Sequence, residues 1–145
     1  MQSLHITPGP VKNRIIEDII KMKSVLTPNA PLPVGPYSQA IIEAPFIFCS
    51  GQIPMDPATS VLASPDIRLQ TMQALENLKA VLEAAGSSFG KVVKTTVYLK
   101  NMSEFSACNE VYASFFSEPF PARSCLQVAA LPKNALVEIE AIARV

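Results

Sequence analysis

A long amphipathic helix followed by a β-branched strand is the feature that most constrains how this chain can fold. In the stretch 66–85 (DIRLQTMQALENLKAVLEAA) apolar side chains recur at helical spacing, and Gly86 follows as a C-cap. The next apolar stretch, 91–100 (KVVKTTVYLK), is rich in β-branched residues and is typical of a strand. Because the apolar stripe of the helix has to be buried, the pair predicts a helix packed on a sheet. The stripe comprises Ile67, Met72, Leu75, Leu78, Leu82 and Ala85.

The other apolar stretches predict further strands and a second helix. Two runs, Ala40–Glu43 and Phe46–Ser50, flank a tight turn and indicate a hairpin, with Gly51 ending its second strand. We also expect a helix over Met102–Phe116, with Ser103 as its N-cap. The remaining strands are a short one at the start of SVLTPNAPL, one over ARSCLQVAAL and a final one over ALVEIEAIARV. The order β-ββ-α-β-α-β-β predicts a two-layer α+β domain.

The composition limits the partners that the chain can bind. Hydrophobic residues make up 49% of the 145 residues and charged residues only 17%, which is an apolar share at the upper end for a monomer. A subunit interface could absorb this surplus, and we therefore expect an oligomer. The 12 Lys and Arg residues balance the 12 Asp and Glu residues, which disfavours nucleic acid and anionic membranes as partners. No apolar run approaches the roughly 20 residues that cross a bilayer.

The cysteines and the single histidine exclude several kinds of site. The three cysteines, Cys49, Cys108 and Cys125, are widely spaced and form no CxxC pair, so we expect a reducing compartment, no disulfide framework and no cysteine-built zinc site. The only histidine is His5, close to the N-terminus. Catalysis by a Ser-His-Asp triad or a Cys-His pair is therefore not expected.

Residues 1–23 look like an extension that precedes a single domain over 24–145. Apolar residues recur at helical spacing in VKNRIIEDIIKM, which predicts a short amphipathic helix. This helix could be a mitochondrial presequence, or it could dock on the domain or on a neighbouring subunit. The acidic Glu17 and Asp18 count against a presequence. We expect the protein in the cytoplasm, with the mitochondrial matrix as the alternative.

The segment PFPARSCLQVAALP contains one charged residue, Arg123. A buried, unpaired charge is costly, so Arg123 should have a partner or a ligand. Side chains alternate along a strand, so Arg123 shares one face with Cys125, whereas Ser124 and Leu126 point to the other. We expect the second set to face the core, which would point Arg123 away from the helices.

Two carboxylates are the candidate partners of this arginine. Glu138 and Glu140 share one face of the final predicted strand. Arg123 could form a structural ion pair with one of them, or it could be a bidentate anchor for a ligand carboxylate, and the pattern leaves both open. For Cys125 the pattern favours a small buried side chain over a nucleophile, because no His or Lys is adjacent to it in the sequence.

Two loop segments could also contribute to a site. Gly51, after Ser50 in CSGQIP, allows the backbone to approach a ligand and to donate to an anion, but it could also simply end the strand. Tyr37, in GPYSQA, lies in a proline-stiffened loop and could either cover a small pocket or pack against the domain.

Several stretches together resemble the RidA family, which is also called YjgF. The stretches are NAPLPVGPYSQA, CSGQIPMDP, ENLKAVLEAAG, VVKTTVYLKNMSEF, PFPARSCLQVAALPK and VEIEAIA. The match runs from about Leu26 to Ala143, and the presence of Arg123 places the resemblance in the enzymatically active branch. The resemblance implies a chorismate-mutase-like α+β fold with a mixed sheet packed on two helices. It also implies a homotrimer with active sites between subunits.

The resemblance further implies an activity and roles for individual residues. Members act as 2-iminobutanoate/2-iminopropanoate deaminases, which hydrolyse reactive 2-imino and 2-enamino acids to 2-keto acids and ammonia without a cofactor or metal. Arg123 matches the residue that holds the substrate carboxylate, and Glu138 matches the residue proposed to position the hydrolytic water. The other pocket residues that the resemblance implies are Tyr37, Ser50, Gly51, Asn109 and Cys125. The sequence leaves open whether desolvation raises the pKa of Glu138 or Arg123 lowers it.

Two other functions are the alternatives. The same pocket could bind a small 2-keto acid without turnover, as a sensor or a chaperone-like protein would. Some relatives carry a ribonuclease or translation-inhibitor label, but the neutral net charge and the absence of any histidine besides His5 argue against RNA chemistry.

Overall fold

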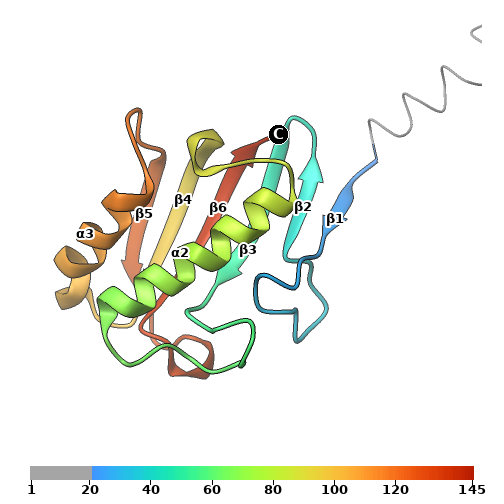
Figure 1. The fold of residues 1–145 in the computed structure, drawn as a ribbon. Coiled ribbons are helices and arrows are strands. Elements are labelled where there is room, and N and C mark those ends of the chain that lie inside the picture. The colour runs from blue at the N-terminus through green and yellow to red at the C-terminus, as the bar shows by residue number, and fades with distance from the viewer. Residues whose placement is uncertain (1–20) are drawn as a thin grey trace, which may run out of the picture.

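The computed structural model describes residues 21–145 and shows one six-stranded sheet with two helices on the same face (Figure 1). The strand order is β1-β2-β3-β6-β4-β5, and only β4 and β5 are parallel neighbours. The strands are β1 (Lys23–Val25), β2 (Ala40–Glu43), β3 (Phe46–Gln52), β4 (Val92–Leu99), β5 (Ala122–Gln127) and β6 (Val137–Arg144). The helices are α2 (Ile67–Ala84) and α3 (Phe105–Phe115), with short 3-10 turns η1 (Phe89–Lys91), η2 (Met102–Glu104) and η3 (Pro132–Asn134).

The predicted α+β class and the mixed sheet with two helices are confirmed. The predicted helix in the N-terminal extension lies almost entirely outside the described residues, so the division into 1–23 and 24–145 stays a prediction. No helix within residues 21–145 is both long enough and apolar enough to cross a membrane.

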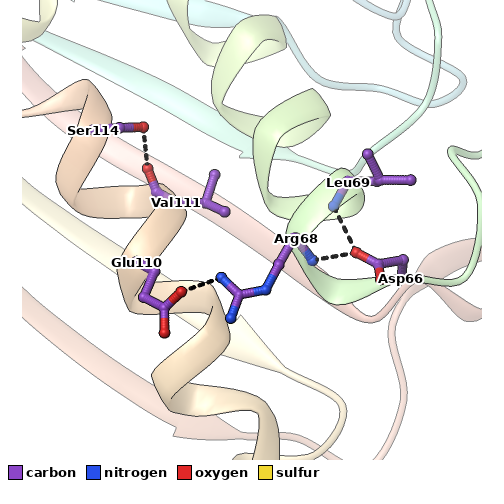
Figure 2. Close-up of polar contacts among 6 residues, drawn as sticks. All are labelled: Asp66, Arg68, Leu69, Glu110, Val111 and Ser114. Carbon is purple, nitrogen blue, oxygen red and sulfur yellow. Dashed lines mark hydrogen bonds and ion pairs between the residues drawn. The ribbon is translucent and has the colours of Figure 1, made fainter.

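A side-chain cap marks where α2 begins, and an ion pair connects the start of α2 to α3 (Figure 2). The carboxylate of Asp66 accepts hydrogen bonds from the backbone N–H groups of Arg68 (2.9 Å) and Leu69 (3.0 Å), which otherwise would lack partners at the helix start. The Arg68 guanidinium then forms an ion pair with Glu110 on α3. Because both side chains of the pair are largely exposed, we assign it little weight in stability.

The C-terminus of α2 also ends where the sequence predicts. Gly86 has a φ of +76° and follows the last helical turn, and the N–H of Ser87 donates to the carbonyl of Leu82 at 2.8 Å. The predicted apolar stripe is buried except at Met72, which is 47% exposed. The start of the second helix was predicted wrongly: α3 begins at Phe105 without a side-chain cap. The turn η2 precedes it, and the side chain of Asn101, not that of Ser103, caps this turn by accepting from the Ser103 N–H at 2.9 Å.

The core lies between the two helices and the sheet, and strand alternation separates it from the opposite face. Along β6, Val137 and Ile139 are fully buried beneath the helices, whereas Glu138 and Glu140 are half-buried on the other side. Within residues 21–145 this other side carries no helix, and we call it the open face (Figure 1).

The predicted orientation of β5 is wrong. In the parallel register Arg123 pairs with Thr95 and Cys125 pairs with Val97, and both β4 residues are buried on the helix side. Arg123 therefore lies on the helix-covered face, and Leu126, which was expected in the core, is 40% exposed on the open face. The alternation of side chains along a strand sorts them into two faces, but it does not say which face the helices cover. The more apolar face can remain exposed in a single chain, as it does here.

Gly51 does not end the hairpin strand, because β3 continues to Gln52. The pairing of β3 with β6 shifts between Cys49 and Gln52, so Gly51 lies in an irregular stretch of the strand. Such an irregularity changes the direction of side chains next to it and often occurs beside functional sites.

A buried amide holds the loop between β1 and β2. The side chain of Gln39 is 1% exposed, and its oxygen accepts from the N–H of Thr27 at 2.7 Å. Its amide nitrogen donates to the carbonyls of Thr27 (3.0 Å), Ala30 (3.3 Å) and Pro31 (2.9 Å). One side chain therefore satisfies backbone groups across the loop that carries Tyr37.

We predict that Gln39→Leu destabilises the protein by about 2 to 4 kcal/mol, because the apolar substitute leaves several buried backbone groups without partners. Urea unfolding followed by circular dichroism measures this change. Gln127→Leu is the matched control, because Gln127 is exposed and its side chain makes a single hydrogen bond, to the Met102 N–H. An equal loss of stability in the two variants would contradict the prediction.

Candidate functional site

The predicted site residues lie in two groups. The first group surrounds a cavity of about 550 Å³ beside the loop that carries Tyr37. Its predicted members are Tyr37, Ser50, Gly51 and Glu138. The other residues that line the cavity are Pro31, Leu32, Val34, Gln39, Gln52, Ile53, Met55, Pro132, Lys133 and Glu140.

Gly51 is required by the position of Glu138. A Cβ atom added to Gly51 would lie 2.0 Å from Oε1 of Glu138, which is less than any real contact distance. The absence of a side chain therefore lets the carboxylate lie directly against the β3 backbone. Ser50 serves the neighbouring loop, because its hydroxyl donates to the carbonyl of Ser38 at 2.6 Å, next to Tyr37.

The environment of Glu138 favours its protonated form. Burial raises the pKa of Glu138 above its ordinary value, and the negative charge of Glu140 on the same face raises it further. The hydroxyl of Tyr98 donates to Oε1 of Glu140 at 3.0 Å and holds that neighbouring carboxylate in place. The question that the sequence left open is thus answered for the single chain: desolvation dominates, and Arg123 is not among the causes of the shift.

The second group surrounds Arg123 at the opposite end of the strand order. Nη1 of Arg123 donates to Oδ1 of Asn109 at 2.7 Å. The guanidinium carbon lies 4.8 Å from the ring centroid of Tyr112 and 5.5 Å from that of Phe105. All three partners belong to α3, which crosses beside β5 (Figure 1). A hollow of about 350 Å³ adjoins the arginine and is lined by Asn109, Tyr112, Ala113, Phe120, Pro121 and Arg123.

Cys125 accompanies Arg123 on this face and packs at the edge of the core. Burial raises the pKa of the Cys125 thiol, and the charge of Arg123 opposes this only in part. The thiol therefore stays protonated near neutral pH, as expected for a small packing residue rather than a nucleophile.

Arg123 and Glu138 lie on opposite faces of the sheet. Arg123 is the neighbour of Thr95 on β4, and Glu138 is the neighbour of Tyr98 on the same strand. Residues 95 and 98 are separated by an odd number of steps, so their side chains, and those of their partners, point to opposite faces. Arg123 and the two glutamates therefore do not share a face within one chain. The alternative in which Arg123 forms a structural ion pair with Glu138 or Glu140 is wrong for the same reason. Among residues 21–145 only Arg68 and Glu110 form an ion pair.

Sequence reasoning missed the aromatic support of Arg123. Tyr112 was counted only as part of an apolar helix side, yet its ring lies against the guanidinium, and its hydroxyl is 2.7 Å from that of the buried Thr95. The spacing of Phe105, Asn109 and Tyr112 at i, i+4 and i+7 was the available signal, because these positions share one face of a helix.

The described part of the chain offers no evident metal ligands. Within residues 21–145 no group of three or more His, Cys, Asp or Glu side chains is placed to hold a metal ion. What the two groups offer is a fixed guanidinium for an anion and, separately, a carboxyl group that can exchange a proton inside a partly apolar cavity.

Comparison with known proteins places these features in a family. The family model described as Endoribonuclease L-PSP matches residues 27–145. The chain is 48% identical over 124 residues to a protein of Salmonella typhimurium named 2-iminobutanoate/2-iminopropanoate deaminase, covering 83% of this chain and 96% of that protein.

Two solved structures show the same fold. One, from Yersinia pestis, is described as a protein of unknown function of the conserved Rid protein family; it is 48% identical, has a TM-score of 0.84, and the match covers 86% of this chain and 100% of that one. The other is TdcF of Escherichia coli with bound serine, which is 44% identical with a TM-score of 0.81 over 85% of this chain and 98% of that one.

We predict that Glu138→Gln makes the protein more stable than the wild type at pH 7 to 8. A carboxyl group whose pKa is raised in the folded state stabilises the fold at pH values below its unfolded pKa, and this stability is lost as the pH rises through the folded pKa. The glutamine removes this titration, so its advantage should shrink as the pH falls from the raised folded pKa toward about 4.3, the ordinary pKa of glutamate, and should change no further below that value.

Thermal unfolding of both proteins between pH 4 and pH 8 measures this difference. Glu76→Gln is the control, because Glu76 is exposed on α2 and its substitution removes the same charge away from the cavity. A Glu138→Gln protein that is less stable than the wild type at neutral pH would refute the prediction.

Proposed function

This chain belongs to the RidA (YjgF) family, and we propose that it hydrolyses reactive 2-imino acids to 2-keto acids and ammonia. The substrates are 2-iminopropanoate and 2-iminobutanoate, together with their 2-enamino tautomers such as 2-aminoacrylate. The reaction consumes one water, breaks the C=N bond and needs no change of oxidation state.

The state of Arg123 is the observation that carries the proposal. Its guanidinium is held by an amide and two rings but forms no ion pair with a residue of 21–145, and it adjoins a hollow of about 350 Å³. A guanidinium with free donors is suited to a bidentate bond with a carboxylate, which every 2-imino acid carries. The serine in the TdcF structure is likewise a small molecule with an α-carboxylate.

Glu138 supplies the proton chemistry. An imine carbon is electrophilic, so a positioned water can attack C2 without a strong nucleophile. Glu138 takes one proton from this water as the C–O bond forms and passes it to the imine nitrogen, which gives an aminoalcohol. It then carries the proton of the new hydroxyl to the nitrogen, so that the C–N bond breaks, ammonia leaves and the keto C=O bond forms. The partial burial that raises the pKa of Glu138 toward neutrality suits a group that must both accept and donate.

We further propose that each site forms between two copies of the chain, within a homotrimer. Because Arg123 and Glu138 lie on opposite faces of one sheet, a site that uses both takes each from a different copy. The open face carries large apolar side chains that a neighbouring copy could cover, among them Phe48, which is 46% exposed, and Leu126, which is 40% exposed.

The two alternative functions have less support. The neutral net charge and the absence of histidine from residues 6–145 disfavour a nuclease, although the family model carries that description. A carboxylate-binding protein without turnover would explain Arg123 but not the half-buried carboxyl of Glu138 in its own cavity.

We predict that Arg123→Ala lowers kcat/KM for imine hydrolysis on the order of a hundredfold or more, while the oligomer survives. The assay couples the protein to a pyridoxal-phosphate dehydratase that supplies 2-aminoacrylate and measures the release of the keto acid. Arg68→Ala is the control, because Arg68 is exposed on α2 and, within residues 21–145, forms its one ion pair with Glu110. Activity retained in Arg123→Ala would refute the proposed role, and binding without turnover in the wild type would favour the carboxylate-binding alternative.

We predict that two inactive variants restore activity when they share an oligomer. Arg123→Ala and Glu138→Gln chains with different affinity tags are co-expressed, and mixed oligomers are isolated on both tags. In a cyclic trimer every mixed composition contains one site with both residues intact, so about one third of wild-type activity should return, whereas a dimer would give about one half. Chains that carry both Arg123→Ala and Glu138→Gln, co-expressed with wild-type chains, are the control for assembly. No recovery in the mixed oligomers would show that a site takes both residues from the same copy.

A further inference from the structure

Tyr112 is the nearer of the two aromatic rings against Arg123, and the proposed function leaves it without a role. Its ring centroid lies 4.8 Å from the guanidinium carbon, nearer than the ring of Phe105 at 5.5 Å. A cation held against the face of an aromatic ring is attracted by the electron density of the ring. Asn109 accepts from Nη1 at 2.7 Å, so the guanidinium is held both through one of its N–H groups and by its position over the Tyr112 ring.

The ring of Tyr112 is itself fixed from two sides. Its hydroxyl lies 2.7 Å from that of Thr95, in a buried hydrogen bond. Thr95 is the β4 residue that pairs with Arg123, so this bond ties the ring to the strand beside the arginine. The ring also stacks on Phe116, with centroids 4.4 Å apart and an interplanar angle of 26°. Tyr112 therefore cannot turn away from Arg123 without breaking a buried hydrogen bond.

This support matters because Arg123 is exposed on the last strand of the sheet. A long side chain at such a place would sample many rotamers, and ordering it on binding a ligand would reduce affinity. The guanidinium lies over the ring of Tyr112 and donates to Asn109, and both residues line the hollow with Phe120 and Pro121. The remaining donors are those that a ligand in this hollow can use.

We propose that Tyr112 is a positioning residue: its ring, fixed by the bond to Thr95, holds the Arg123 guanidinium in the orientation that receives a substrate carboxylate. The identity of the ligand rests on the proposed function, but the orientation of Arg123 does not, because it can be measured without turnover. Binding and turnover are therefore tested separately.

The first experiment reads the arginine directly in 1H–15N spectra of arginine side chains. The signal that disappears in Arg123→Lys identifies the Nε–Hε group of Arg123. In the wild type this proton should be shifted by the ring current of Tyr112. The shift should fall in Tyr112→Leu, which removes the nearer of the two rings, and should persist in Tyr112→Phe, which keeps it. An Arg123 signal that is the same in wild type and Tyr112→Leu would overturn the proposal.

The second experiment separates binding from chemistry in the oligomer. Tyr112→Leu should raise KM for the imine, and the dissociation constant for pyruvate, about five- to thirtyfold, with kcat changed less than about threefold. Tyr112→Phe should raise both constants by a smaller factor. Phe115→Leu is the matched control, because it removes a ring of the same aromatic cluster that packs edge-on against Phe89 rather than on Tyr112. If Phe115→Leu raises KM as much as Tyr112→Leu, loss of packing explains the effect and the proposal fails.

The outcomes distinguish the two proposals. A wild-type protein that hydrolyses no imine, but whose Arg123 signal and pyruvate affinity both depend on the Tyr112 ring, would refute the deaminase activity and support the positioning role. If the wild type is active and Tyr112→Leu changes neither KM nor the Arg123 signal, the deaminase activity is supported and the positioning role of Tyr112 is refuted.

Discussion

The pairing of β4 with both β5 and β6 is the constraint on which the rest of the structure depends. β4 is the only strand in residues 21–145 that has a parallel neighbour on one side and an antiparallel neighbour on the other. Its register places Arg123 beside Thr95 and Glu138 beside Tyr98, and strand alternation then separates the two charged groups by the thickness of the sheet. Neither side-chain rotation nor a loop movement can bring them together. The separation of Arg123 from Glu138 is therefore set by the pairing of the strands and not by side-chain conformation.

Most helices and strands were predicted correctly, because the residues that start and end them lie within a few positions of one another. The helix from Ile67 ends at a glycine with positive φ, and the hairpin strands begin where the apolar runs begin. The predictions that failed depend on contacts between segments that are distant in the sequence. Met72 was placed in the stripe because it is apolar, but Gln70 and Thr71 form the buried face at that turn of the helix. Leu126 is also apolar, yet it lies on the open face. Both faces of β5 carried apolar residues, so only the register with β4 could decide its orientation.

The candidate site shows the same limit. The resemblance identified residues but not their neighbours, and one chain brings Tyr37, Ser50, Gly51 and Glu138 together while keeping Arg123, Asn109 and Cys125 apart from them. The contact between Gly51 and Glu138 needs two strands that are far apart in the sequence, and the support of Arg123 needs a helix to cross a strand. Asn109 was expected at the substrate, and within one chain it holds the arginine.

The separation of the two charges also bears on how the proposed chemistry is tuned. In a single chain the pKa of Glu138 is raised by burial and by Glu140, with no opposing effect from Arg123. In the proposed composite site, the guanidinium of another copy would approach this carboxyl and offset part of the rise in its pKa, since a nearby positive charge favours the ionised form. A substrate carboxylate bound to that guanidinium would cancel much of the charge and restore the proton affinity of Glu138. The glutamate would then hold its proton most tightly when substrate is present, which is when the leaving nitrogen needs one.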